Sequence, residues 1–445
     1  MSLKKEYIAI LGLGLPILVG QLGSIVTGFV DNMMVGHFST QALAAASFCN
    51  NFFNTAMLAC MGFTMGITPL VGAMSAGKNT TDIGRMMRTA VRVNTLFCCI
   101  VTAIMGILYF FVDRMGQPVE LLPLIRPYYL LCLAGMIPVT LFNAFAQWSY
   151  GINNTSTPMW IILGVNVLNV IGNYALIFGK FGMPRMGLTG AGISTFAARI
   201  IAGAAMIAVF FYVKKYSDYR KGYSNASSRP YPYGKIWLTS LPVSLQMAFE
   251  TAAFSGAAVL CGWLGTIPLA AFQVIVVMGT LGFCVYYAIG AAVAVRVSNS
   301  AGTGDVRAMR RSAWAGYHIM LAIMVLSSLT FVFAGPTIIS VFTDDTAVIA
   351  VAVSLIVPMV LYQLGDATQI TFANALRGTT RVMPMLWCAL FSYLILGLPS
   401  SFLLGFTCNL GVYGIVLSFS VSLFTAAALY LYFFVRETRL HFSQN

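Results

Sequence analysis

The stretch LGLGLPILVGQLGSIVTGFVDNMMVGHF, residues 11–38, is apolar over almost its whole length. A membrane-spanning helix needs about 20 apolar residues, so this stretch predicts one span. Asp31 carries the only formal charge between Glu6 and Lys78, with histidine counted as neutral. A single carboxyl group in so apolar a segment needs an explanation, and the rest of the chain repeats the pattern.

The composition is that of an integral membrane protein: 59% of residues are hydrophobic, 8% are charged and the mean hydropathy is +0.85. Soluble domains carry about 25% charged residues. Continuous apolar runs without alternation favour helices over a β-barrel. No small-residue cleavage site follows the first run, so we expect a retained helix. We predict twelve spans, near 8–35, 47–71, 93–112, 127–149, 159–179, 188–213, 236–260, 270–295, 313–334, 346–373, 383–406 and 410–434.

The basic residues predict the topology. If the N-terminus is cytoplasmic, 20 basic residues fall in cytoplasmic segments, four fall outside and Arg199 lies within a span. This asymmetry follows the positive-inside rule and places both termini in the cytoplasm. The net charge of +13 then reflects topology and attraction to anionic membrane lipid, and we expect no nucleic-acid binding.

A duplication organises the chain. The longest polar stretch, residues 214–235, predicts a cytoplasmic linker between an N-terminal six-helix lobe (1–213) and a C-terminal six-helix lobe (236–445). The Leu-Pro pair at 15–16 recurs at 241–242, an offset of 226 that other segments share to within one residue. Six spans per half give a parallel repeat and two pseudo-symmetric bundles, as in alternating-access transporters. Pro16 and Pro242 would kink equivalent helices, either as hinges or as static bends.

Three carboxyl groups lie inside predicted spans: Asp31, Glu250 and Asp366. Each charge at mid-bilayer costs about 2.5–3.5 kcal/mol on insertion scales. A desolvated carboxyl group favours its protonated form, whereas a bound cation favours the ionised form. Such groups can therefore exchange a proton, Na⁺ and a cationic ligand. The alternative is a structural ion pair, for example with Arg199.

Polar side chains accompany the first carboxyl group. Asn169 and Asn173 are spaced i, i+4 and share one helix face, which Asn166 could join, and Thr195 lies in the next span. Na⁺ prefers oxygen ligands, so Asp31, Asn169 and Asn173 form a candidate Na⁺ site. Interhelical hydrogen bonding is the alternative role for these side chains.

In the second half, Tyr362 and Asp366 are also spaced i, i+4, and Gln273 follows Glu250 by one hairpin. These four side chains could face one cavity, with Glu250 and Asp366 as a second candidate Na⁺ site.

Four features together resemble the MATE (multidrug and toxic compound extrusion) transporters, and in particular their NorM-like bacterial branch. They are the pattern LPILVGQ…DNMMVGHF (15–38), FETAAF (249–254), LGDATQ (364–369) and the half-repeat. The resemblance covers essentially the whole chain. It implies two six-helix lobes in a V shape and export of cationic, amphipathic compounds in exchange for Na⁺ or H⁺.

The resemblance also implies roles for individual residues. Cation or proton binding falls to Asp31, Asn169, Asn173, Thr195, Glu250, Tyr362 and Asp366, and drug contact to Gln273, Asp366 and Asp31. Asp344 and Asp345 would attract cations at the outer mouth. Some relatives carry a second aspartate where this chain has Asn173, which leaves the coupling ion open.

We therefore expect a multidrug antiporter of the bacterial inner membrane, functional as a monomer, with no cofactor beyond Na⁺ or H⁺. A lipid-linked oligosaccharide flippase of the same superfamily is the alternative, although only Arg199 lies mid-span to hold a pyrophosphate. A channel is a further alternative, but isolated acids in a repeat suit an occluded binding site better than a continuous pore. An intramembrane enzyme would need a catalytic set, and His318 has no evident partner in the sequence, so we expect no enzymatic activity.

Overall fold

The computed structural model describes residues 2–77, 79–225 and 229–443, which form long helices joined by turns. Eleven of these helices are long and apolar enough to cross a membrane. The bent pair α13 (Thr346–Ser354) and α14 (Ile356–Gly378), with 45° between its members, makes twelve when taken as one span. The predicted all-helical membrane fold is confirmed. The helices extend beyond the predicted runs because helical structure continues into the charged ends.

The chain forms two compact units that exchange the beginnings of their first helices. The N-terminal unit comprises Val19–Ser244, and the C-terminal unit comprises residues up to Leu18 together with those from Leu245 onward. The two changes of unit, after Leu18 and after Ser244, are 226 residues apart (244 − 18), the offset of the sequence repeat. These units differ from the predicted lobes mainly in segments 1–18 and 236–244. Within the predicted linker, residues 226–228 lie outside the described residues.

Both exchanged segments belong to helices that contain proline. Helix α1 (Leu3–Phe38) runs through Pro16, and α10 (Tyr233–Leu264) runs through Pro242. Each proline lies two residues before its helix changes unit. Proline removes one backbone hydrogen bond, so each helix is least constrained close to this point.

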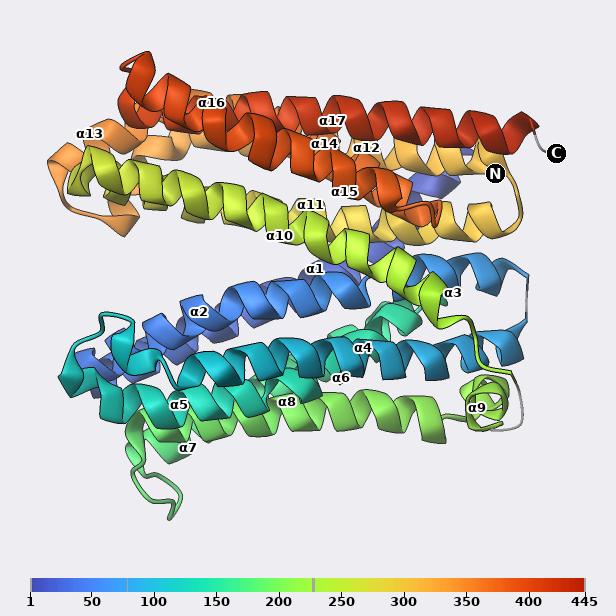
Figure 1. Cartoon of the computed structure of the whole chain (residues 1–445), viewed down its shortest axis with the longest axis horizontal. Coiled ribbons are helices and arrows are strands. Elements are labelled where there is room, and N and C mark those ends of the chain that lie inside the picture. Colours follow the sequence, from blue (N-terminus) through green and yellow to red (C-terminus); the bar gives the residue numbers. More distant parts are fainter. Residues whose placement is uncertain (1, 78, 226–228, 444–445) are drawn as a thin grey trace. The chain divides into compact units, whose positions relative to one another are not determined.

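The N-terminal unit packs its helices around two apolar clusters, one including Trp148 and the other Tyr129. Figure 1 follows its helices from blue to green. They are the second part of α1, α2 (Thr40–Thr64), α3 (Ile67–Ala76), α4 (Thr80–Tyr109), α5 (Leu122–Ala134), α6 (Met136–Gly151), α7 (Ser156–Phe178), α8 (Gly187–Tyr212), α9 (Ser217–Ser224) and the first part of α10.

The C-terminal unit is centred on α14, which packs along the last helix, α17 (Gly411–Ser443), and along α11 (Thr266–Gly302) (Figure 1). Helix α12 (Val306–Phe342) packs against both α11 and α14. The eleventh predicted span combines α15 (Met383–Ala389), α16 (Leu398–Phe402) and two π-helical stretches, Leu390–Gly397 and Leu403–Thr407.

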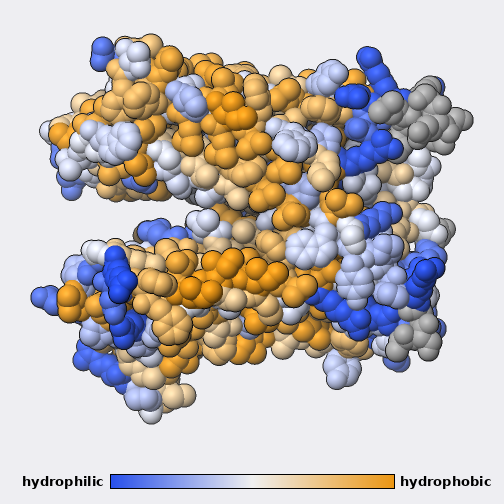
Figure 2. Space-filling model, viewed as in Figure 1, coloured by the Kyte–Doolittle hydropathy of each residue, from blue (hydrophilic) through white to orange (hydrophobic). Residues whose placement is uncertain are grey.

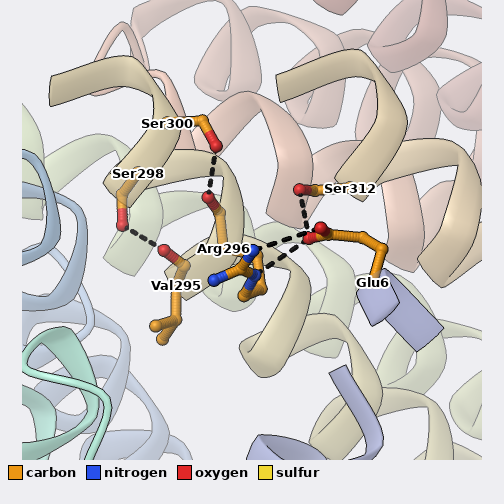
Figure 3. A network of polar contacts seen from close by, with 6 residues as sticks. All are labelled: Glu6, Val295, Arg296, Ser298, Ser300 and Ser312. Carbon is orange, nitrogen blue, oxygen red and sulfur yellow. Dashed lines mark hydrogen bonds and ion pairs between the residues drawn. The ribbon is translucent and has the colours of Figure 1, made fainter. Parts of the chain in front are cut away.

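A buried ion pair holds the first segment of α1 in the C-terminal unit (Figure 3). Arg296 donates from Nε to Glu6 Oε1 at 2.9 Å and from Nη2 to Oε2 at 3.1 Å. Ser312 Oγ, on α12, adds a third donor at 2.6 Å from Oε1. Because Glu6 is 1% exposed, this bidentate pair replaces its hydration with three directed hydrogen bonds.

Equivalent tyrosines attach the two exchanged segments. Tyr7 OH lies 2.9 Å from His318 Nδ1, and Tyr233 OH accepts from Arg92 Nη1 at 3.5 Å. Tyr7 and Tyr233 are separated by the repeat offset of 226. The interaction also gives His318 a structural partner, which the sequence did not reveal.

The described part of the linker contains α9, which crosses α4 at two glycines. A Cβ on Gly222 would lie 1.9 Å from the Thr81 carbonyl oxygen, and one on Gly84 would lie 1.9 Å from that of Tyr219. Only glycine permits backbones to approach so closely. Burial raises the pKa of the Tyr219 phenol. The Tyr219 ring also packs on Trp148, with 5.6 Å between the two ring centroids.

On the face shown in Figure 2, apolar residues cover the middle of the helices and hydrophilic residues gather toward their ends. This distribution suits helices surrounded by lipid along their length and by water at their ends.

Candidate functional site

Asp31, the carboxyl group that stood out in the sequence, lies among polar side chains of α7 and α8. Asn173 Nδ2 donates to Asp31 Oδ1 at 2.5 Å. The Asn169 side-chain amide is assigned with its nitrogen toward Asp31, because this orientation satisfies the neighbouring hydrogen-bonding groups. The nitrogen then donates to both Asp31 oxygens, at 3.1 and 3.2 Å. In this orientation the amide oxygen accepts from the Thr195 backbone N–H at 3.3 Å, and Ser194 Oγ lies at the same distance.

The sequence brings these groups together through helix geometry. Asn169 and Asn173, one turn apart on α7, present their amides to the same side. Gly172 lets α8 approach, because a Cβ there would lie 2.5 Å from Ser194 Oγ. Ser194, which was not predicted from the sequence, donates from its hydroxyl to the Asn169 backbone carbonyl at 2.9 Å.

This cluster contains the atoms that a proton or a hard cation needs. The Asn173 side-chain oxygen is buried and has no hydrogen-bond partner among the described residues. An amide that turns over replaces its N–H donors with an oxygen acceptor. The two asparagines can therefore either hydrogen-bond the carboxylate or join it as oxygen ligands around a cation.

The second cluster surrounds Glu250 on α10, in the C-terminal unit. Gln246 Nε2, one turn earlier, donates to Glu250 Oε2 at 3.1 Å, and Gln369 Nε2, on α14, donates to Oε1 at 3.2 Å. Gln369 Nε2 also lies 2.5 Å from the Tyr393 hydroxyl oxygen, and its own amide oxygen is buried without a partner among the described residues. Gln246, Gln369 and Tyr393 were not predicted from the sequence.

Asp366 shares this cluster. Its carboxyl group interacts electrostatically with Glu250 and with the hydroxyl groups of Tyr362 and Tyr286. Within the described residues, Asp366 forms none of the five ion pairs. Two carboxyl groups that repel each other, with no cation beside them, can bind a proton or a metal cation between them.

The structural alternative, an ion pair between a span carboxylate and Arg199, does not form among the described residues. Arg199 Nη2 instead donates to the Met57 sulfur at 3.6 Å.

Three other predicted site residues stand apart from these clusters. Gln273 is exposed on α11 and makes no hydrogen bond to a described residue through its side chain. Asp345 caps α13, accepting from the backbone N–H groups of Ala347 and Val348 at 2.9 and 3.3 Å, and Asp344 is exposed beside it.

A chain that crosses the membrane many times and keeps carboxyl clusters inside its spans has the design of a membrane transporter. The MatE family model matches residues 16–175 and 242–403, so the chain belongs to this family. It is a multi-pass membrane transporter and not an enzyme.

Individual proteins agree with this assignment. The chain is 28% identical to the "Probable multidrug resistance protein NorM" of Xanthomonas axonopodis pv. citri, over 87% of this chain and 84% of that protein. It is 30% identical to the "Multidrug resistance protein PmpM" of Pseudomonas aeruginosa, over 92% and 86% of the two chains. A solved outward-facing MATE family transporter has a TM-score of 0.89 over 98% of this chain and 97% of its own, at 15% identity, which supports the fold.

Proposed function

We propose that this chain exports cationic, amphipathic compounds across the bacterial inner membrane in exchange for Na⁺ or H⁺, by alternating access. The carboxyl pair of Glu250 and Asp366 is the observation that carries the proposal. Two interacting acids in membrane spans, surrounded by amides and phenols, suit a group that gains and loses a cation during each cycle. The names of the bacterial relatives support drugs as the substrates.

The Asp31 cluster is the second place where the exchange would occur. The drug cation and the coupling ion would compete for the same negative charge, so binding of one would release the other. Each in its own unit, Asp31 and Asp366 would bind the cationic group of a drug, and Gln273, exposed on α11, would contact the uncharged part of a drug bound in the C-terminal unit.

The ion gradients are large enough for this work. One charge that crosses 100 mV releases about 2.3 kcal/mol, and one pH unit adds about 1.4 kcal/mol. Together they would sustain a drug gradient of a few hundredfold per proton if coupling is tight. The asymmetry of 20 predicted cytoplasmic basic residues against four outside supports cytoplasmic termini. Each half of the chain supplies its own carboxyl cluster, which is consistent with a functional monomer.

Ethidium efflux from cells and proteoliposomes tests the proposal, with Na⁺ and pH gradients imposed separately. We expect Asp31→Asn, Glu250→Gln and Asp366→Asn to reduce gradient-driven efflux at unchanged membrane expression. Gradient-driven efflux that survives all three substitutions would show that these carboxyl groups do not couple transport.

A further inference from the structure

Two cationic side chains of the N-terminal unit lie where predicted apolar spans begin. Arg92, on α4, directly precedes the predicted span 93–112, and Lys235, in the first turn of α10, directly precedes the predicted span 236–260. Basic residues that flank the cytoplasmic ends of spans lie at the level of the lipid headgroups. Both side chains are exposed.

Contacts between α4 and the start of α10 bring these two positions together. Arg92 Nη1 donates to the Tyr233 hydroxyl oxygen at 3.5 Å, and Tyr233 precedes Lys235 by two residues. Slightly further along both helices, the rings of Phe97 and Trp237 pack edge to face, with 6.1 Å between their centroids. The two helices therefore lie side by side at this level, and each contributes one cation.

No described acidic side chain neutralises these two cations, because neither of them forms any of the five ion pairs. Asp82 of α4 and Asp218 of the linker are paired with Arg85 and Lys221. The Arg92 guanidinium group carries five N–H donors. Its one hydrogen bond to a described residue is the long contact with Tyr233. An exposed guanidinium fork of this kind suits the oxygens of a phosphate group.

Exposed apolar side chains continue from both cations into the spans. Leu96 and Ile100 follow Arg92 at i+4 and i+8 on the same side of α4, and they are 55% and 47% exposed. Leu238, one turn after Lys235 on α10, is 58% exposed. Two cations at headgroup level, with an apolar surface beside them in the membrane, match the two parts of a phospholipid molecule.

The internal repeat shows that the fold does not require these cations. At the offset of 226, Arg92 corresponds to His318, and Lys235 corresponds to Ala9. The tyrosine contact is kept in the C-terminal unit, between Tyr7 and His318 at 2.9 Å. The second cation is replaced there by alanine, so the pair of cations is specific to the N-terminal unit and needs its own explanation.

We propose that Arg92 and Lys235 bind the phosphate group of one anionic phospholipid of the cytoplasmic leaflet. Its acyl chains lie along the exposed side chains of Leu96, Ile100 and Leu238. The lipid bridges α4 and the first part of α10, the segment that belongs to the N-terminal unit. The inference depends on neither the transported substrate nor the coupling ion.

Native mass spectrometry of the purified full chain in detergent tests the inference. The probes are phosphatidylglycerol and phosphatidylcholine with identical acyl chains. We expect wild type to retain one phosphatidylglycerol more tightly than phosphatidylcholine. Arg92→Gln/Lys235→Gln should lower the affinity for phosphatidylglycerol by about tenfold or more, because each cation near an anionic lipid contributes about fivefold. Leu96→Ala/Leu238→Ala should weaken the binding of both lipids, because it removes apolar surface and no charge.

A matched control removes two charges elsewhere on the same predicted side of the membrane. Arg307→Gln/Arg436→Gln neutralises two exposed arginines of the C-terminal unit and should leave the affinity for phosphatidylglycerol unchanged. An excess of inorganic phosphate should not displace the lipid, because phosphate makes no contact with the apolar side chains. In vesicles of phosphatidylethanolamine and phosphatidylglycerol, a photoreactive phosphatidylglycerol should label peptides of α4 and α10 in wild type.

Equal affinity of wild type for the two lipids would overturn the inference, and so would an equal loss in the control variant. Displacement by inorganic phosphate would show that the cations bind a free anion and not a lipid. If Arg92→Gln/Lys235→Gln does not reach the membrane, the labelling of wild type decides, and label confined to other helices would refute the site.

Discussion

Asn173 Nδ2 lies 2.5 Å from Asp31 Oδ1, although 142 residues separate the two in the chain. The contact joins the second part of α1 to α7 and holds the carboxylate toward the Asn169 amide. The amide can serve the carboxylate as a donor or, when turned, serve a cation as a ligand. This relationship makes Asn173 the most informative position for testing the first cluster.

We predict that Asn173→Leu lowers the apparent affinity of efflux for the coupling ion by about tenfold or more. A hydrogen bond to a charged group contributes about 1.5–3 kcal/mol, and the variant also removes an oxygen. Ethidium efflux at graded Na⁺ and pH measures the effect. Asn166→Leu, in the same helix, is the matched control, because the Asn166 Nδ2 has no described partner. Equal losses in the two variants would contradict a specific role for Asn173.

In the second cluster, Gln369→Leu should weaken coupling in the same assay. Gln369 Nε2 bridges Glu250 Oε1 and the Tyr393 hydroxyl, so leucine leaves Glu250 with Gln246 as its one side-chain donor among the described residues. We expect a loss of about tenfold in apparent ion affinity. The control is Gln363→Leu, six residues earlier on α14, which removes a buried amide bound to Ser327 and not to a carboxylate. An effect at Gln363 as large as that at Gln369 would argue for general packing damage.

Helix periodicity explains which site residues the sequence could reveal. Asn169 and Asn173 were identifiable because a spacing of four places them on one face of an apolar helix. Gln246 has the same spacing from Glu250, and Gln369 follows Asp366 by three, so the same rule would have found both. Tyr393 could not be found, because it lies on a π-helical stretch 24 residues beyond Gln369, where helical spacing gives no guide.

The exchange of the first helix segments between the two units could not be predicted from the sequence. The twelve spans and the repeat could be predicted, because hydropathy and internal similarity are visible in the sequence itself. The grouping of residues up to Leu18 with the C-terminal unit depends on contacts such as that between Glu6 and Arg296, which are 290 residues apart. The first predicted span begins near residue 8, which leaves Glu6 outside it, and no sequence pattern indicates that its side chain is buried.

The Glu6 ion pair predicts a stability effect. Glu6→Leu leaves Arg296 and Ser312 without their shared carboxylate, and removing one partner of a buried pair typically costs about 3–5 kcal/mol. Thermal unfolding of the purified protein in detergent should show a clear fall in melting temperature. Asp218→Asn, which breaks the exposed pair with Lys221, should change stability by less than about 1 kcal/mol. Similar melting temperatures for wild type and Glu6→Leu would mean that the pair does not hold α1 in place.

The crossing of α9 over α4 gives a prediction for the linker. Gly222→Ala places a methyl group 1.9 Å from the Thr81 carbonyl oxygen, and neither backbone can yield without moving a helix. Overpacking of this kind costs about 1–3 kcal/mol or more, so we expect a lower melting temperature and faster proteolysis near residue 222. Gly164→Ala is the matched control: nothing lies within 4 Å of the added Cβ, and alanine favours the helix by about 1 kcal/mol over glycine. The two substitutions should therefore shift the melting temperature in opposite directions, and a shift in the same direction would show that α9 is free to move away from α4.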